Sequence, residues 1–275
     1  MKKYAQAIAS STCLLAAMAV WTTAGAQGAQ SYARGQDVSP TFDGWQQNAD
    51  GTYTLHFGYF NRNTEEEIDV PVGPGNAFDQ GGDRGQPTHF YPARKWWVFN
   101  VVVPSDWPKA QRLVWTLTTH GKTSQAKGWL QPEWEVDQDL INKNGARDPS
   151  LMTNGTNQVD LDHENRAPSM TGSPAQTINA SDTLALTVTA TDDGRPKPVP
   201  DPGGRIQQGV RVRWIVYRGV GKVRFDPDIM SGRVLGKPAT LPTKVSFTSP
   251  GAYRLRAIAS DGQAFSTYDV DVTVK

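Results

Sequence analysis

The chain has 275 residues, enough for one large domain or two domains of ordinary size. It is 37% hydrophobic and 20% charged, with 26 glycines and 19 prolines, which excludes a disordered chain and favours a turn-rich β protein. The formal charge of +1 is too balanced to indicate a nucleic-acid partner or binding to an anionic membrane surface.

Residues 1–26 have the features of a cleaved signal peptide. Lys2 and Lys3 supply the positive charge, an apolar run follows, and “AGA” offers a cleavage site before Gln27. The run is shorter than the ~20 residues of a spanning helix, so we expect cleavage rather than a membrane anchor. The mature chain would then lack cysteine, carry 26 basic against 27 acidic residues, span no membrane, and be secreted, periplasmic or on the cell surface.

We expect a flexible stretch over residues 27–38, followed by a β-sandwich over residues 39–140. Short runs alternate between apolar and polar residues and end at glycine, proline or asparagine, which is typical of antiparallel strands with one buried face. No 3.6-residue helical period follows the signal segment, so no helix is expected. The clearest strands are “YTLHFGYF” and “KWWVFNVVV”, with these residues facing inward: Tyr53, Leu55, Phe57, Tyr59, and Trp97, Phe99, Val101, Val103.

Three motifs of this first half carry a family resemblance. They are “FGYFNRN”, “VPVGPGNAF” and “DRGQPTHFYPAR”, followed by a “W-T-L” strand. In this order they resemble a recurrent, functionally uncharacterised module of bacterial extracellular proteins. The resemblance implies an immunoglobulin-like sandwich and no catalytic activity.

Residues 141–165 are polar and rich in glycine, asparagine and aspartate, which indicates a linker. The end of this segment, “DLDHENRAP”, resembles the D-x-N-D-N-x-P linker of cadherins. The resemblance implies that Asp160, Asp162, Glu164 and Asn165 hold a calcium ion between two domains, because calcium prefers hard oxygen ligands. The alternative is an acidic, solvated linker with no metal. No other cofactor is expected.

Residues 166–275 show the strongest strand pattern. About seven short runs alternate with period two, which predicts a second antiparallel sandwich of the immunoglobulin-like type. The residues expected to face inward are Leu184, Leu186, Val188, Ala190, Val210, Val212, Trp214, Val216, Val245, Phe247, Tyr253, Leu255, Ala257, Ala259, Val270, Val272 and Val274. The predicted fold class is therefore all-β, with two sandwiches in tandem after the signal peptide.

The same half resembles the bacterial immunoglobulin-like repeats of the polycystic-kidney-disease (PKD) type, which are cadherin-like extracellular modules. The motifs are “NRAP”, “TVTATDDGRPKP”, “VRWIVYRGVGKVRF” and “SPGAYRLRAIASDG”. The resemblance implies that Trp214 is the core tryptophan and that Tyr253 forms a tyrosine corner. Both are structural roles.

Catalytic motifs are missing from the sequence. It contains no nucleophile elbow, no phosphate-binding glycine loop and no H-E-x-x-H motif. Glu133, Glu135 and Asp137 alternate with apolar residues and are expected to line an exposed strand face. Asp83, Arg84, His89 and Tyr91 lie together in “GGDRGQPTHFYPARKWW”, residues 81–97, so an uncharacterised hydrolase would have its site near Asp83 and His89.

Aromatic residues suggest a different binding function. Seven of the eight tryptophans of the mature chain lie in its first half, and exposed aromatic rings stack on sugars in carbohydrate-binding sandwiches. Adjacent residues of a strand face opposite sides, so one of Trp96 and Trp97 is expected to be exposed. The candidate ligand-binding residues are Tyr91, Trp96, Trp97 and Trp107. Packing of these rings in the core is the alternative.

The sequence favours a non-enzymatic exported protein, either a structural or adhesive module or one that binds another protein of the bacterial envelope or exterior. Carbohydrate binding by the first half is the alternative, with an envelope glycan as the partner. A hydrolase is the third hypothesis.

Overall fold

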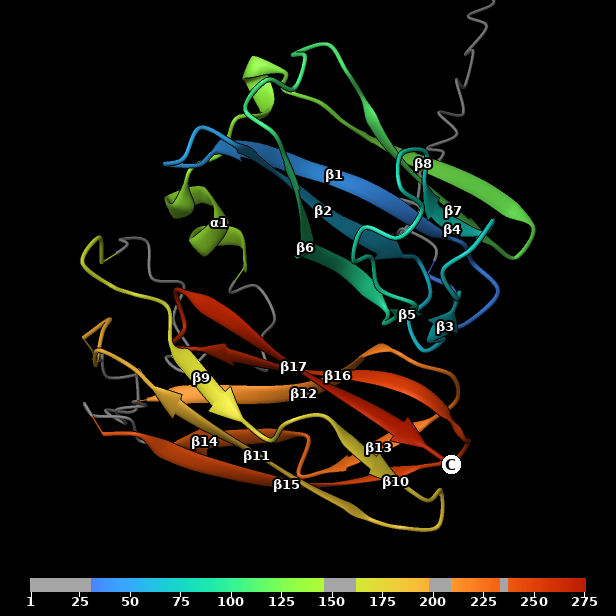
Figure 1. Cartoon of the computed structure of the whole chain (residues 1–275), viewed down its shortest axis with the longest axis vertical. Helices are drawn as coiled ribbons and strands as arrows, with labels where there is room; N and C mark the ends of the chain where they lie inside the picture. Colours follow the sequence, from blue (N-terminus) through green and yellow to red (C-terminus); the bar gives the residue numbers. More distant parts are fainter. Residues whose placement is uncertain (1–30, 146–161, 198–208, 233–236) are drawn as a thin grey trace, which may run out of the picture. The chain divides into compact units, whose positions relative to one another are not determined.

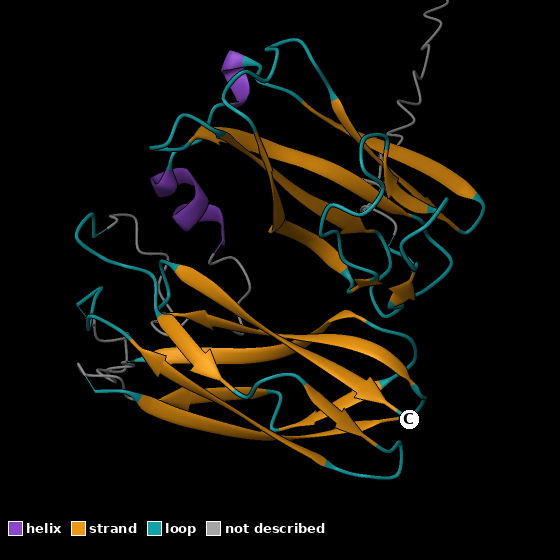
Figure 2. Cartoon of the chain, in the orientation of Figure 1, coloured by secondary structure: helices purple, strands orange, loops and turns teal. Residues whose placement is uncertain are grey.

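The computed structural model describes residues 31–145, 162–197, 209–232 and 237–275, which belong to one compact unit. Their regular structure is almost entirely strand (Figures 1 and 2), which confirms the predicted all-β class. All paired strands are antiparallel except β10 and β17, which are parallel. No helix in these residues is long and apolar enough to cross a membrane. The predicted signal peptide lies outside the described residues.

The first eight strands form the N-terminal sandwich. Two three-stranded sheets have the orders β1-β2-β6 and β4-β7-β8, and β3 pairs with β5. The strands are β1 (Val38–Gln47), β2 (Tyr53–Asn61), β3 (Ile68–Asp69), β4 (Asn76–Phe78), β5 (His89–Phe90), β6 (Ala93–Val103), β7 (Leu113–Thr119) and β8 (Lys122–Gly128).

One hydrophobic core joins the two larger sheets of the N-terminal sandwich. Leu55, Phe57 and Val101 from the first sheet meet Trp115 and Leu117 from the second, and all five are at least 96% buried. Rings in this core meet at 5.0–6.4 Å, mostly edge to face, an arrangement that aromatic quadrupoles favour. The predicted inward residues of β2 therefore lie where their period-two pattern places them.

Trp97 departs from the predicted face of β6. The register between β2 and β6 shifts opposite Gly58, and the backbone at Trp97 has φ 53°. Its N–H donates to the buried Asp43 carboxylate at 2.9 Å, and Asp43 also pairs with Arg94. The bulge turns the Trp97 ring away from the core and onto His56, with ring centroids 5.6 Å apart. A bulge changes the alternation of a strand, so the prediction that Trp97 shares the core face was wrong.

Two short helical segments follow β8, contrary to the expectation of none. A 3₁₀ helix, η1 (Pro132–Trp134), occupies the place of the predicted exposed strand, although Glu133 and Glu135 are exposed as expected. The α-helix α1 (Gln138–Gly145) begins after Asp137, whose carboxylate accepts the N–H of Leu140 at 2.7 Å as an N-terminal cap. The helix is too short to show a clear period in the sequence.

Strands β9 to β17 form the C-terminal sandwich. Its sheets have the orders β10-β17-β16-β12-β14 and β13-β15-β11-β9, so β16 lies between β17 and β12 (Figure 1). The strands are β9 (Ser169–Gly172), β10 (Gln176–Ile178), β11 (Leu184–Thr191), β12 (Val210–Arg218), β13 (Val223–Asp226), β14 (Ile229–Gly232), β15 (Ala239–Phe247), β16 (Gly251–Ser260) and β17 (Phe265–Val274).

This strand order is immunoglobulin-like. The sheet β9-β11-β15-β13 matches strands A, B, E and D, and β12, β16 and β17 match C, F and G. After β12, the chain forms β13 in the first of these sheets and then β14 in the sheet that contains β12. Every residue predicted to face inward in this half is at least 92% buried in one core, so the period-two interpretation is confirmed.

Trp214 and Tyr253 lie in that core. Trp214 on β12 is 1% exposed and stacks on Phe225 at 6.2 Å. The Tyr253 hydroxyl, near the start of β16, donates to the carbonyl of Ser249 at 2.7 Å and to that of Val220. This hydrogen bond back to a residue four positions upstream is the geometry of a tyrosine corner.

Candidate functional site

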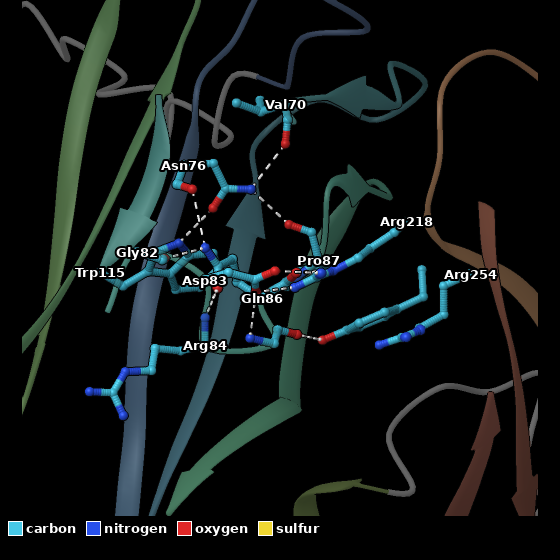
Figure 3. Close-up of polar contacts among 12 residues, drawn as sticks. Val70, Asn76, Gly82, Asp83, Arg84, Gln86, Pro87, Trp115, Arg218 and Arg254 are labelled. Carbon is cyan, nitrogen blue, oxygen red and sulfur yellow. Dashed lines mark hydrogen bonds and ion pairs between the residues drawn. The ribbon is translucent and has the colours of Figure 1, made fainter. Parts of the chain in front are cut away.

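The segment that contains Asp83 and His89 forms a loop over residues 81–91, hereafter the 81–91 loop. Its centre is Gln86, whose side chain is fully buried. The Gln86 amide donates to the carbonyls of Gly82 (3.0 Å) and Asn76 (3.1 Å), and its oxygen accepts the N–H of Arg84 (2.8 Å; Figure 3). Buried main-chain groups need partners, and this side chain supplies three of them.

Asn76 supports the loop from β4. Its side-chain nitrogen donates to the carbonyls of Val70 (3.0 Å) and Pro87 (2.8 Å), and its oxygen accepts the indole N–H of Trp115 (2.9 Å; Figure 3). Inside the core, the Gln86 side chain thus satisfies the Asn76 carbonyl, and the Asn76 side chain satisfies the carbonyl of Pro87 in the loop. The quoted motifs contain both residues, but alternation of apolar and polar residues predicts no buried amide.

The outer side of the 81–91 loop contacts β12 of the C-terminal sandwich. The Arg218 guanidinium binds both oxygens of Asp83 (2.7 and 3.0 Å) and also donates to the carbonyl of Gln86 (2.8 Å; Figure 3). These hydrogen bonds hold the pKa of Asp83 below its usual value. Because the planar guanidinium donates hydrogen bonds to both a carboxylate and a carbonyl of the loop, it fixes the orientation of the loop.

Tyr217, beside Arg218, enters the other core. The register between β12 and β16 shifts at this residue, and the ring is 2% exposed among the core residues of the N-terminal sandwich. Its hydroxyl donates to the carbonyl of Gly85, and the Arg256 guanidinium lies 3.5 Å from the ring centroid. The N-terminal core is therefore completed by a side chain from the C-terminal sandwich.

Main-chain groups complete this contact. The N–H of Thr88 donates to the carbonyl of Tyr217 (3.1 Å), and the N–H of Gly219 donates to the Thr88 hydroxyl (3.1 Å). The Tyr91 hydroxyl accepts the N–H of Val216 at 2.9 Å. The loop therefore contacts four consecutive residues, 216–219, at the end of β12 and directly after it. A sequence pattern of separate strands does not predict this contact.

His89 lies between two carboxylates and is 7% exposed. Its ring nitrogens contact Asp69 at 2.7 Å and Glu67 at 3.1 Å. Burial disfavours the imidazolium, but the two carboxylates outweigh it and raise the pKa of His89 to about 9. An imidazolium already bound on both nitrogens cannot accept a proton at neutral pH, and Asp83 is bound elsewhere. The structure does not bring Asp83 and His89 together as a catalytic pair.

The four aromatic residues proposed for a ligand do not form one surface. The Tyr91 hydroxyl accepts a hydrogen bond from β12, and Trp97 is buried beside Val136 and Ile141. Trp107 is partly buried against the N-terminal core, with its indole N–H on the Gln111 carbonyl. Trp96 is 38% exposed, but Arg94 lies 3.8 Å from its ring centroid.

The predicted calcium ligands are likewise separated. Asp160 lies outside the described residues. The Asp162 carboxylate receives two hydrogen bonds from Arg195, at 2.8 and 3.0 Å, and a third from the Glu164 N–H at 3.1 Å. The Glu164 carboxylate pairs with the same guanidinium. Asn165 instead donates to Asp261 at 3.1 Å. A guanidinium therefore occupies the carboxylates that were expected to face a metal.

Asn165 belongs to a group of buried oxygens that the sequence did not single out. Asp192 and Asp261 are 9% and 4% exposed, and burial raises the pKa of each to about 6. One side-chain oxygen of Asn165 and one of Asp192 are buried without a hydrogen-bond donor.

Such oxygens suit a calcium ion, which is bound by six to eight oxygen atoms. Asn165, Asp192 and Asp261 could therefore bind calcium only if main-chain or water oxygens supplied the remaining ligands. In the described residues, no group of three or more histidine, cysteine or acidic side chains is arranged for a metal.

Comparisons with known proteins give no family. No protein-family model and no curated protein matches the chain. Among solved structures, the D00-D0 domain of intimin is similar, with 12% identity, a TM-score of 0.27, and coverage of 87% of this chain and 100% of that one. A protein of unknown function from Porphyromonas gingivalis W83 has 13% identity, a TM-score of 0.25, and coverage of 86% and 98%. At these TM-scores the likeness supports no argument, so the fold rests on its strand order.

Proposed function

We propose that the chain is a non-enzymatic, exported module of the bacterial envelope or exterior, with a structural or protein-binding role. The observation that supports the proposal most strongly is the use of the 81–91 loop. Asp83, His89 and Tyr91 are the side chains that suggested chemistry, and each is bound to another part of the chain. A catalytic acid, base or nucleophile must reach the substrate, whereas each of these three side chains is directed to a partner within the chain.

The loop serves instead to join two sandwiches. Contacts of Arg218 and Tyr217 with the loop resist separation of the sandwiches, and this suits a module that carries load or presents surfaces at a fixed spacing. The PKD-type resemblance of residues 166–275 is part of this proposal. Its motifs lie at the “DDG” turn after β11, at Trp214 and at the “SDG” turn after β16.

The role of the loop can be tested by limited digestion with trypsin at Arg84, which lies in the middle of it. Arg218→Ala removes the guanidinium that holds Asp83, so cleavage after Arg84 should accelerate by about tenfold, as expected for a contact of 1–2 kcal/mol. The control is Arg195→Ala, which breaks an ion pair with Asp162 that does not involve the loop. Equal cleavage in both variants would show that Arg218 does not hold the loop.

Two further measurements test the remaining parts of the proposal. The mature chain should turn over no ester, glycoside or peptide substrate, and turnover that disappears in His89→Gln would establish a hydrolase instead. Expression of the full chain in a bacterial host should give an exported protein that begins at Gln27. Retention of the uncleaved chain in the cytoplasm would contradict export.

A further inference from the structure

Trp134, the last residue of η1, is 44% exposed, and η1 contains no buried residue. Its ring stacks on Phe42 with centroids 5.7 Å apart and planes at 24°. Phe42 in turn stacks on Trp129 at 6.4 Å and 16°. Trp134 is therefore an exposed member of an aromatic stack that begins in the protein interior.

The stack is fixed in place. Phe42 also contacts the core ring of Phe57 at 5.5 Å, and a Cβ atom at Gly128 would lie 2.9 Å from the Phe42 ring, so Phe42 fits closely against β8. The Gln131 carbonyl accepts the Trp134 N–H at 3.0 Å and the indole N–H of Trp45 at 2.7 Å. A ring held in this way loses little conformational entropy when a ligand binds.

Two other tryptophans of the N-terminal sandwich, the exposed Trp96 and the partly buried Trp129, each have an arginine over the ring. The guanidinium of Arg94 lies 3.8 Å from the ring centroid of Trp96, and that of Arg112 lies 5.1 Å from Trp129. Trp134 is more exposed than Trp96, yet none of the cation–π contacts among the described residues involves it. Its ring is therefore open to a cation from outside the chain.

The charges around Trp134 favour such a cation. Glu133 and Glu135 flank it, both are exposed, and neither carboxylate forms a hydrogen bond or ion pair within the described part of the chain. The two acidic residues that follow are engaged, since Asp137 caps α1 and Asp139 contacts His163 at 3.1 Å. Two unpaired carboxylates beside an exposed indole attract a positively charged group.

We propose that Trp134, Glu133 and Glu135, hereafter the Trp134 surface, bind an arginine side chain in a basic segment of a partner protein. The guanidinium stacks on the indole face, and its N–H groups donate to the flanking carboxylates. A neutral sugar ring would also stack on the indole, but only a cation gains from the negative charge of the two carboxylates. The inference rests on the protein-binding form of the proposed function and names the chemistry of the partner.

The test uses the mature chain, residues 27–275, and a synthetic Gly-Arg-Gly-Arg-Gly peptide as the probe. Titration is followed by the indole N–H signals in NMR, assigned by substitution. We expect the Trp134 signal to shift with the arginine peptide and not with its citrulline counterpart, which keeps the shape but lacks the charge. This measurement needs no variant that must fold.

Variants then divide the effect between ring and charge. Trp134→Ala should weaken binding by about two- to fivefold, the loss expected for one exposed cation–π contact. Glu133→Gln with Glu135→Gln should weaken it similarly at low salt and less at high salt, where such charges are screened. Trp96→Ala is the matched control, because Trp96 already carries Arg94, and it should bind like the unchanged chain.

Several results would overturn the inference. They are equal affinity in Trp134→Ala, equal binding of the citrulline peptide, or a Trp134 signal that moves only with cello- or chito-oligosaccharides. Absence of any shift would show that Trp134 is only a cover for the core. The proposed function would survive all of these, whereas substrate turnover by the mature chain would contradict that function and leave peptide binding unaffected.

Discussion

Replacement of Tyr217 by alanine should destabilise the N-terminal sandwich, although residue 217 belongs to β12 of the C-terminal one. The ring is 2% exposed and packs in the N-terminal core. Loss of a buried aromatic ring costs about 3–5 kcal/mol, to which the hydrogen bond to the Gly85 carbonyl contributes about 1 kcal/mol. Tyr217→Phe keeps the ring and should therefore cost only about 1 kcal/mol.

Hydrogen–deuterium exchange measured by peptide mass spectrometry locates the loss. In Tyr217→Ala we expect faster exchange in β5 and β7, which line the N-terminal core, as well as in β12. Trp214→Ala is the control, since that ring lies three residues away on β12 but in the C-terminal core, and it should affect β11 to β17 first. Unchanged exchange in β1 to β8 of Tyr217→Ala would refute the shared core.

Three further results are expected. His89, whose pKa rises to about 9 in the folded chain against about 6.5 unfolded, contributes about 1–3 kcal/mol that is present below pH 6.5 and lost as pH rises through 9. His89→Gln should abolish that alkaline loss of stability, and an equal loss in both proteins would contradict it. With a chelator present, the raised pKa of Asp192 predicts a lower free energy of unfolding at pH 7 than at pH 5. The reason is that the Asp192 carboxyl holds its proton more tightly in the folded state than in the unfolded state. Asp192→Asn should reduce this difference, and urea unfolding at the two pH values measures it. If calcium binds there, it should raise the melting temperature at pH 7 only while Asp192 is present; no rise in the unchanged chain would exclude calcium.

The sequence predicted the C-terminal sandwich well because its strands have one buried face throughout. Leu184 to Ala190 and Val270 to Val274 follow strict alternation, and each inward residue meets the core. This pattern depends only on the two-residue period of a strand, so it can be read without knowledge of neighbouring strands.

Residues at bulges could not be predicted in the same way. Trp97 and Tyr217 both lie at register shifts, where one additional residue redirects the following side chains. The shift at Trp97 depends on a buried carboxylate from another strand, Asp43, which no local pattern reveals. The sequence therefore did not predict that Trp97 is turned away from the core face of β6. It also did not predict that Tyr217 packs in the N-terminal core.

The buried amides illustrate a second limit. Asn76 and Gln86 look like ordinary turn residues in the sequence, yet both are fully buried. Both side chains lie in the protein interior because carbonyl groups of the loop backbone point inward and need hydrogen-bond donors. Burial of a polar side chain follows from the path of the surrounding chain, which is known only once the fold is known.

The pair of Asp83 and Arg218 tests the central claim most directly, that the 81–91 loop holds the two sandwiches together. A double-mutant cycle of Asp83→Ala and Arg218→Ala, measured by urea unfolding, gives the energy of their interaction. The bidentate geometry, with Arg218 20% and Asp83 50% exposed, predicts a coupling of about 0.5–1.5 kcal/mol. A coupling near zero, with both single variants as stable as the unchanged chain, would contradict the claim.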